Sequence, residues 1–374
     1  MAATQRFTAL DVFRGMTVCF MIIVNTPGNG ATSFSPLNHA KWHGFTPTDL
    51  VFPSFLFAVG NAMSFAMLKW NDLPQSKVWG KILKRTFIIF LLGFLMYWFP
   101  FVQWNEEHRL VFSPFAHTRV FGVLQRIALA YGFAATIVYY CKPKTAAIIG
   151  ALILLLYWVL LYVPGVDGDP LAMMTNNGTR LDKFILPDTH LYHGEGVPFD
   201  PEGLLSTLPA IVNVICGYLV GIFLKQKGKT WEALSMLLLT GTALLTLGYF
   251  WDLLLPINKK LWTSSFVVYT VGLDCLILSA VIYLIDFKQK TRWNYFFEVF
   301  GKNPLFIYLL SELGATLLYF FHAGPHQNLH GWIFQNIFSH AGMYVGSLLY
   351  AICFMLVCWL AGYWLDKRKI YIRV

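Results

Sequence analysis

The sequence predicts an all-α polytopic membrane protein with about ten transmembrane helices. Three observations predict this fold class. Hydrophobic residues make up 57% of the 374 residues and charged residues only 13%, about half the charged fraction of an ordinary soluble domain. Apolar runs long enough to cross about 30 Å of hydrocarbon recur along the chain. Lys and Arg cluster in the short connections between these runs, which is typical of membrane proteins.

Ten apolar runs define the predicted spans. They are Leu10–Val24, Leu50–Leu68, Ile82–Val102, Val120–Tyr140, Ala146–Val163, Leu204–Leu224, Ala233–Leu254, Phe266–Ile285, Asn303–Phe321 and Met343–Leu365. No Ala-x-Ala cleavage pattern follows the first run, so we interpret it as a retained helix and not as a signal peptide. The stretch Ile333–Phe338 is too short to span and is expected to lie at the interface or dip in. No internal repeat or linker stands out, and we treat residues 1–374 as one domain.

The positive charges alternate between the connections. The second, fourth, sixth and eighth connections and the C-terminal tail are rich in Lys and Arg, whereas the long connection Pro164–Gly203 is acidic. The positive-inside rule therefore places both termini in the cytoplasm and the connections Asn25–Asp49, Gln103–Arg119 and Pro164–Gly203 outside. These three are rich in Gly, Pro, His and Trp, and we expect them to form a cap over the outer mouth.

The net charge of +9 does not indicate a nucleic-acid partner, because the cations follow the membrane pattern. The six cysteines lie in or beside apolar stretches without a CxxC pair, as small core residues do. His39 and His43 are four residues apart, but no third ligand stands at metal spacing. We therefore expect no metal. From spacing alone, His39 is better explained as an interfacial histidine bonded to the loop backbone than as a catalytic residue.

Ionisable residues inside apolar spans are candidates for function because burying them in lipid is costly. Asp11 and Arg14 share one face of the first helix and either pair with each other or line a polar pocket at the inner mouth. Arg126, beside Gln125, lies about two turns inside its span and is expected to face an interior cavity. Four further polar residues fall within or near spans, where an Asn often only bonds two helices together: Asn213, Asp274, Asn303 and Glu312.

Several blocks of the sequence occur in an order that resembles one known family. They are Leu10-Asp-Val-Phe-Arg-Gly15, Val24-Asn25, His39-Ala-Lys-Trp-His-Gly44, Asp49-Leu-Val-Phe-Pro53, Arg119-Val-Phe-Gly-Val-Leu-Gln-Arg126, Asp200-Pro-Glu-Gly203 and Gly301-Lys-Asn-Pro304. The sequence resembles, over essentially its whole length, the heparan-α-glucosaminide N-acetyltransferase family of transmembrane acyltransferases. Lysosomal members carry an extra luminal domain and an additional N-terminal helix. This sequence begins at the first block and resembles the shorter bacterial relatives.

The resemblance implies acetyl transfer across a bacterial inner membrane. Acetyl-CoA would enter from the cytoplasm, and the acceptor would be the amino group of a terminal glucosamine or related amino sugar outside. The family's active-site histidine matches His39 and its nearby asparagine matches Asn25. The Asn-Pro of Gly301–Pro304 and the Gly-, Ser- and Pro-rich loop after Asn25 depart from relatives, which leaves the acceptor open. The oligomeric state also stays open, a homodimer included.

The implied chemistry suits these residue types. An amine that attacks a thioester must lose a proton, and a histidine with an ordinary pKa near ~6.5 can accept it. The Asn25 amide could donate to the developing oxyanion. Asp49 could fix the tautomer of the imidazole or cap the second helix. We favour direct transfer over an acetyl-histidine intermediate because no second nucleophile suggests itself.

The cofactor and acceptor are assigned to separate sets of residues. The phosphates of CoA need cations at the inner face, and the absence of a GxGxxG or P-loop pattern argues against a nucleotide-binding fold. The residues expected to hold CoA are Arg14, Lys84, Arg85, Gln125, Arg126, Lys302 and Asn303. Those expected to hold the acceptor are Trp42, Arg119 and Asn213. Trp42 could stack on a sugar, although tryptophan is also common at membrane interfaces.

Two other functions fit the same spans. A secondary transporter or a flippase for a sugar or lipid-linked glycan would also have intramembrane arginine and broken apolar runs. Such a protein would not need a CoA-sized basic pocket on one side. An acyltransferase that modifies another glycan hydroxyl is the third possibility. Co-purified CoA would separate the enzymes from the transporter.

Overall fold

The computed structural model describes residues 7–70, 72–163, 168–324 and 327–372. Helices dominate these residues, and two short antiparallel hairpins accompany them. The helices are α1 Thr8–Asn25, α2 Pro47–Ala66, α3 Gln75–Trp98, α4 Val123–Tyr140, α5 Pro143–Tyr162, α6 Asn177–Ile185, α7 Thr207–Lys227, α8 Trp231–Trp251, α9 Ser264–Ile282, α10 Asn294–Lys302, α11 Pro304–Phe320, α12 Leu329–Ile333 and α13 Met343–Lys367. The strands are β1 Val102–Trp104, β2 Leu110–Phe112, β3 His322–Gly324 and β4 Gln327–Asn328. The predicted all-α fold is confirmed.

Each of the ten predicted spans coincides with a helix, but not all qualify as simple spans. Within the described ranges, eight helices are long and apolar enough to cross a membrane, and the bent pair α10–α11 makes nine. The predicted span that remains, Ile82–Val102, falls on α3, a helix of 24 residues. It is not among those eight, and its first half carries Lys77, Lys81, Lys84 and Arg85. The chain is a multi-pass membrane protein.

The ninth predicted span is broken at Asn303. α10 and α11 meet there at an angle of 83°. Pro304, the first residue of α11, disfavours a helical conformation at the residue before it. Asn303 accordingly has φ −130° and ψ 52°. The break leaves the Gly301 carbonyl at the end of α10 free to accept hydrogen bonds from a side chain, as helix ends do.

Close helix packing at the centre relies on small residues. α2 packs along α7, and α1 packs along α10 and α2. A Cβ at Gly217 of α7 would collide with the Phe57 carbonyl of α2, and one at Gly60 of α2 would collide with the Val214 carbonyl of α7. Glycine allows the backbones of membrane helices to approach closely in this way. The result is a tight α1–α2–α7 centre that fixes the first outer connection above it.

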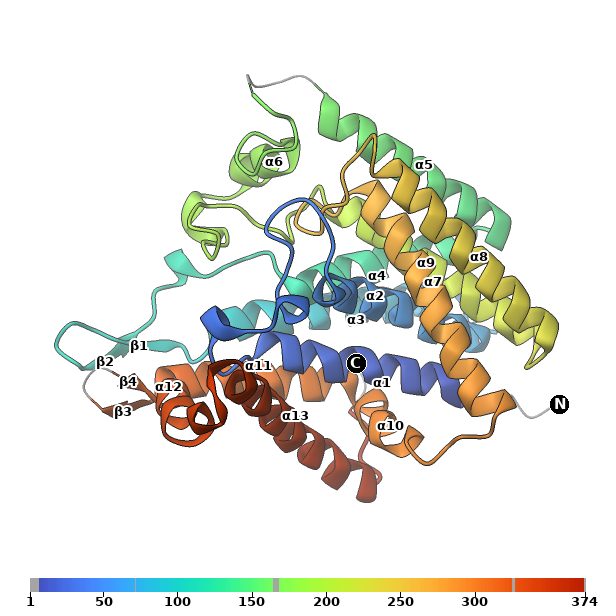
Figure 1. Cartoon of the computed structure of the whole chain (residues 1–374). Helices are drawn as coiled ribbons and strands as arrows, with labels where there is room; N and C mark the ends of the chain where they lie inside the picture. The colour runs from blue at the N-terminus through green and yellow to red at the C-terminus, as the bar shows by residue number, and fades with distance from the viewer. Residues whose placement is uncertain (1–6, 71, 164–167, 325–326, 373–374) are drawn as a thin grey trace.

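The outer connections lie together at one end of the helices. Figure 1 shows the hairpins β1–β2 and β3–β4 side by side at the left of the view. Hydrogen bonds join connections that are distant in sequence: Trp42 Nε1 to Leu171 O (3.1 Å), Trp104 Nε1 to Phe320 O (3.1 Å) and Lys260 Nζ to Lys41 O (2.9 Å). The odd connections therefore form a cap, as the sequence predicts. Residues 164–167, at the start of the long acidic connection, lie outside the described part of the chain.

The stretch Ile333–Phe338 belongs to this cap. It continues α12 into a π-helical turn over Phe334–Phe338, where Phe334 is buried and Ile337 is exposed. The turn packs against the start of α13. The stretch is too short to span, as predicted.

Candidate active site

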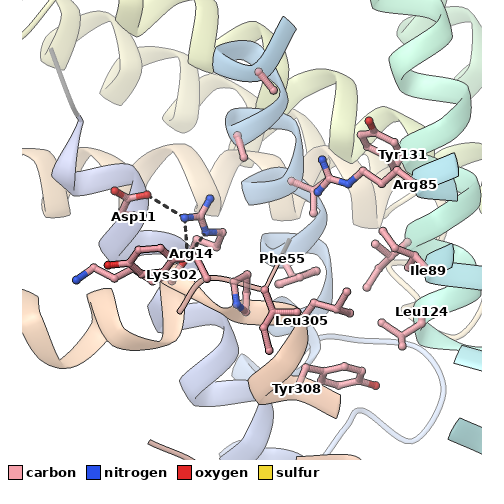
Figure 2. A pocket seen from close by; sticks show the side chains of 18 of the residues that line it. Asp11, Arg14, Phe55, Arg85, Ile89, Leu124, Tyr131, Lys302, Leu305 and Tyr308 are labelled. Atoms are coloured by element: carbon pink, nitrogen blue, oxygen red, sulfur yellow. Dashed lines mark hydrogen bonds and ion pairs between the residues drawn. The ribbon is translucent and has the colours of Figure 1, made fainter. Parts of the chain in front are cut away.

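A large cavity lies among α1, α2, α3, α4 and α11, at the end opposite the cap. Its volume is about 620 Å³. Most of its wall is apolar, for example Phe55, Ile89 and Leu305, and its polar groups gather toward one end. Figure 2 shows Asp11, Arg14 and Lys302 on one side of this cavity and Arg85 with Tyr131 on the other. We call it the inner cavity.

Arg14 is the best-anchored cation of the inner cavity. Its Nη2 donates to Asp11 Oδ1 at 2.9 Å and to Gly301 O at 2.6 Å, and its Nε donates to the same carbonyl at 2.9 Å. The predicted Asp11–Arg14 pair therefore forms, and the pair also lines a polar pocket. The sequence left open whether Asp11 and Arg14 pair with each other or line a polar pocket, and in the structure they do both. The carbonyl that Arg14 binds is the one exposed by the break at Asn303.

Arg85 and Lys302 complete the cationic lining. The Arg85 guanidinium lies 4.5 Å from the centroid of the Tyr131 ring. Its buried Nε has no hydrogen-bond partner among the described residues. Lys302 Nζ contacts both oxygens of Asp366, at 2.9 and 3.0 Å. Arg85 thus keeps a donor for a ligand, whereas Lys302 is partly engaged by the end of α13.

A second, smaller cavity lies beneath the cap. Its volume is about 190 Å³, and its lining includes Asn25, His39 and Arg119. Met21 lines both this outer cavity and the inner one. Met21 and Asn25 lie one turn apart on α1, so Met21 stands between the two cavities near the outer end of this helix. We call the region around Met21 the neck.

His39 and Asp49 form a hydrogen-bonded pair in the outer cavity. His39 Nδ1 lies 2.7 Å from Asp49 Oδ1, and the Asp49 side chain is buried. Asp49 Oδ2 accepts the backbone N–H groups of Ala40 (3.1 Å) and Thr46 (3.0 Å). Asp49 is therefore both the third residue of a capping box on α2 and the partner of the imidazole. The N-cap of α2 is Thr46 and not Asp49, but Asp49 takes part in the cap and also contacts the imidazole.

Asn25 faces α11. Its Nδ2 donates to Glu312 Oε1 at 3.2 Å. An amide nitrogen carries two N–H groups, and this hydrogen bond uses one of them. The other can serve a ligand in the outer cavity.

Arg119 is held by carboxylates of the third outer connection. Its Nε and Nη2 contact Asp200 at 3.0 and 2.6 Å, and Nη2 contacts Glu202 at 2.6 Å. Burial opposes the charge of Arg119, but the Tyr97 hydroxyl and the two carboxylates raise its pKa well above the ordinary value. Burial likewise acts to raise the pKa of Glu202, and Arg119 holds it below the ordinary value. The network stays charged and fixes one wall of the outer cavity.

Lys259 and Lys260 enter the outer cavity from the connection between α8 and α9. Lys259 Nζ lies 3.0 Å from Nε2 and 3.2 Å from Nδ1 of His39. Burial lowers the pKa of Lys259, partly countered by Glu202 and Asp49. Lys260 Nζ pairs with Glu195 at 2.6 Å. The Lys259 ammonium group therefore lies against the imidazole of His39.

Several residues that the sequence assigns to CoA lie away from the inner cavity. Lys84 is exposed, because it lies one residue from Arg85 and so points to a different face of α3. Gln125 is buried against α3 and donates to the Val120 carbonyl at 3.0 Å. Arg126 is buried over the Trp262 ring and bonds Ser206 and the Gly203 carbonyl. Their neighbours on α4, Leu124 and Ile127, line the inner cavity instead.

Asn303, Asn213 and Trp42 have structural partners. Asn303 Nδ2 donates to the Ile370 carbonyl (3.0 Å) and Oδ1 accepts the N–H of Ile372 (2.8 Å), which fixes the C-terminal tail beside the inner cavity. Asn213 accepts from Trp262 Nε1 at 3.0 Å within the bundle. The indole of Trp42 donates to the Leu171 carbonyl. Of the predicted site residues, the structure thus brings together His39, Asn25, Asp49 and Arg119. It places Asn303, Asn213 and Trp42 elsewhere.

Four other side chains take part in the site without having been assigned to it. They are Glu202, Lys259, Tyr308 and Glu312. Glu202 lies in the Asp200–Gly203 block, and Glu312 is an acid inside an apolar span, so the sequence offered a signal for both. Lys259 and Tyr308 have no comparable signal. Within the described ranges, no group of three His, Cys, Asp or Glu side chains could hold a metal ion.

The chain is similar to known acetyltransferases. Residues 6–186 match the family described as heparan-alpha-glucosaminide N-acetyltransferase, catalytic. The chain is 26% identical to the heparan-alpha-glucosaminide N-acetyltransferase of Homo sapiens over 428 residues, which cover 100% of this chain and 60% of that protein. It is 24% identical to the protein of the same name from Mus musculus, over 100% of this chain and 61% of that one. The chain thus spans about three fifths of the length of these relatives.

Proposed function

We propose that the chain is a transmembrane N-acetyltransferase, because its residues 6–186 match the family described as heparan-alpha-glucosaminide N-acetyltransferase, catalytic. It takes the acetyl group of acetyl-CoA in the inner cavity. It transfers that group to the amino group of a terminal glucosamine or related amino sugar in the outer cavity. The protein would lie in a bacterial inner membrane, with the cap on the extracytoplasmic side, in keeping with the alternation of the positive charges.

One observation carries this proposal: a cationic cavity and a cavity lined by the histidine of a His–Asp pair lie on either side of Met21, which lines both. Acetyl transfer between compartments needs such a pair of sites, because donor and acceptor must meet at one carbonyl carbon while their remaining parts stay on opposite sides. A transporter has no need for a histidine base at the meeting point.

The inner cavity suits CoA. CoA combines a polyanionic nucleotide with a long, thin thioester arm. Arg14, Arg85 and Lys302 offer charge-assisted donors to phosphates at one end of the cavity. The apolar wall between them and Met21 suits the arm. The thioester would then reach the neck below Asn25.

The outer cavity supplies the base. Asp49 accepts the proton on His39 Nδ1, which leaves the lone pair of Nε2 to receive a proton from the acceptor amine. Lys259, against the ring, disfavours the imidazolium before the amine arrives. The free N–H of Asn25 donates to the oxyanion that forms as the amine attacks. Arg119, held rigidly by Asp200 and Glu202, supports the acceptor from the opposite wall.

The test is acetylation of glucosamine by the purified protein in detergent, followed by mass detection of the N-acetylated sugar. His39→Ala should lower the rate by about 10²–10⁴, the usual contribution of a general base, and should leave CoA affinity nearly intact because the phosphates lie at the inner end. His43→Ala is the matched control, since His43 shares the loop and is exposed, and it should keep most activity. Wild-type turnover in a folded His39→Ala variant would overturn the base role and strengthen the transporter alternative.

A further inference from the structure

α1 and α11 run parallel through the neck. Arg14 of α1 reaches Gly301 just before α11, and Asn25, eleven residues later, reaches Glu312. Tyr308 and Glu312 lie four residues apart on one face of α11. Tyr308 lines the inner cavity, and Asn25 lines the outer one. Two parallel helices thus carry polar groups from one cavity to the other.

These groups form a continuous hydrogen-bonded chain. Asn25 Nδ2 donates to Glu312 Oε1 at 3.2 Å, and the Tyr308 hydroxyl is hydrogen-bonded to the Glu312 carboxyl. The wall around the chain is largely apolar: Met21, Val24, Val51, Leu124 and Leu305. The sulfur of a thioester in the neck therefore has the Tyr308 hydroxyl as a polar neighbour on the side of α11, and the Glu312 carboxyl lies behind that hydroxyl.

Glu312 lies among neutral groups. Among the described residues it forms no ion pair, and its hydrogen-bond partners are an amide and a hydroxyl. The other titratable groups that act on it or on Tyr308 are Tyr97 of α3 and Glu202 of the third outer connection. A carboxyl with such neighbours is disposed to hold a proton and to give it up when a stronger base forms beside it.

We propose that the Tyr308 hydroxyl protonates the sulfur of CoA as the thioester breaks, and that Glu312 resupplies this proton and positions Asn25. This inference rests on the proposed function. A thiolate is poorly stabilised against an apolar wall, so a proton donor at the sulfur assists its departure. His39 then accepts a proton from the amine, and the Tyr308–Glu312 pair supplies a proton to the sulfur.

The step balances in atoms and charge. The amine nitrogen forms a bond to the acetyl carbon, and one of its protons passes to His39 Nε2. The carbon–sulfur bond breaks with its electron pair on sulfur, which takes the proton of the Tyr308 hydroxyl. The Glu312 carboxyl reprotonates Tyr308 and regains its own proton from water in the inner cavity. His39 returns its proton to water outside, so the products are the N-acetyl sugar and free CoA thiol.

The test compares two donors with different leaving groups. One is acetyl-CoA, and the other is its selenoester analogue, whose selenolate leaves without a proton. With acetyl-CoA, Tyr308→Phe and Glu312→Gln should each lower the rate of glucosamine acetylation by about 10². With the selenoester, both variants should approach the wild-type rate. Glu312→Gln keeps an oxygen that accepts from Asn25, so Asn25 stays in place. Ser311→Ala, a buried hydroxyl on the same helix, is the control and should change neither rate.

Equal losses with both donors would overturn the proton-donor role and leave Tyr308 and Glu312 with a structural one. Wild-type rates with acetyl-CoA in both variants would overturn it as well. Melting temperature and CoA affinity, measured for each variant, separate misfolding from lost chemistry. If the wild-type protein acetylates no amino sugar with either donor, the proposed function fails instead, and that result is distinguishable from the other two.

Discussion

The inner and outer cavities handle charge in different ways. The inner cavity is the larger, about 620 Å³ against about 190 Å³, and its cations lie toward one end of a wide apolar wall made by membrane helices. In the outer cavity, Arg119 and Lys260 are each held by carboxylates that come from loops. The inner cavity therefore suits a large anionic ligand, whereas the outer cavity holds a few side chains in fixed positions.

The two cavities should therefore respond differently to mutation. Removing a cation from the inner cavity should weaken binding of CoA and leave the chemistry intact. Removing a group from the outer cavity should slow the chemistry and leave CoA binding intact. Each variant below tests this division.

After His39→Ala, the largest effect is expected at Asn25. Asn25→Ala removes the predicted oxyanion donor and should lower the rate of acetylation by about 10²–10³, with CoA affinity unchanged. Asn38→Ala is the control, because Asn38 belongs to the same connection, is exposed, and bonds only the Ser33 carbonyl among the partners found for its side chain. A loss of CoA affinity in Asn25→Ala that matches the loss of rate would place Asn25 on the donor side and break the division.

The next effect concerns the inner cavity. Arg14→Ala and Arg85→Ala should each weaken CoA binding by about ten- to hundred-fold, since a charge-assisted contact contributes about 1.5–3 kcal/mol. The maximal rate with saturating acetyl-CoA should stay near that of the wild type. Lys84→Ala is the matched control beside Arg85 on an exposed face. Calorimetry that finds unchanged CoA affinity in the double variant would remove these residues from the cofactor site.

A pH dependence is expected in the cap. Burial raises the pKa of Asp182 in α6 to about 7, partly offset by the Leu204 N–H that it accepts at 2.9 Å. Between the ordinary Asp value and about pH 7, the folded state thus holds a proton that the unfolded state releases, so this group's contribution to stability falls as pH rises through that window. The melting temperature in detergent should drift down from pH 5 to pH 7, and Asp182→Asn should flatten the drift. An equal fall of the melting temperature in the variant would show that other titratable groups cause it.

The smallest effect is expected at Trp42. Its indole donates to the Leu171 carbonyl at 3.1 Å. Trp42→Phe should cost about 0.5–1.5 kcal/mol of stability, visible as a lower melting temperature, with an unchanged KM for the acceptor. Trp104→Phe, which loses a similar bond to Phe320, is the control. A raised KM without a change in melting temperature would show instead that Trp42 stacks on the sugar.

The helices and the outer cap could be predicted from the sequence because both follow from local composition. Apolar runs give the spans, and the alternation of cations sorts the connections by side. The helix break at Asn303 was not predicted, although Pro304 favours it, and the hydrogen bonds of Arg14 to the Gly301 carbonyl depend on this break. The tail contact of Asn303 could not be predicted, because it joins residues that no sequence spacing relates.

Part of the candidate site could also be predicted, because some of its contacts are local in the sequence. His39 and Asp49 are ten residues apart in one connection, and their contact follows from local folding onto the start of α2. Lys84 and Arg85 look alike in sequence, yet adjacent residues on a helix point about 100° apart, so only one faces the cavity. Lys259, Tyr308 and Glu312 come from distant helices and loops. Only the packing of α1 against α11 brings Glu312 to Asn25.

The most direct test of transfer between compartments is an assay in sealed proteoliposomes. Acetyl-CoA and a membrane-impermeant glucosaminide are supplied on the same side or on opposite sides, and N-acetylated product is measured by mass spectrometry. Product should form only when acetyl-CoA faces the Arg14 end and the glucosaminide faces the His39 end. Product formed with both reactants on one side, at the rate seen across the membrane, would contradict the account.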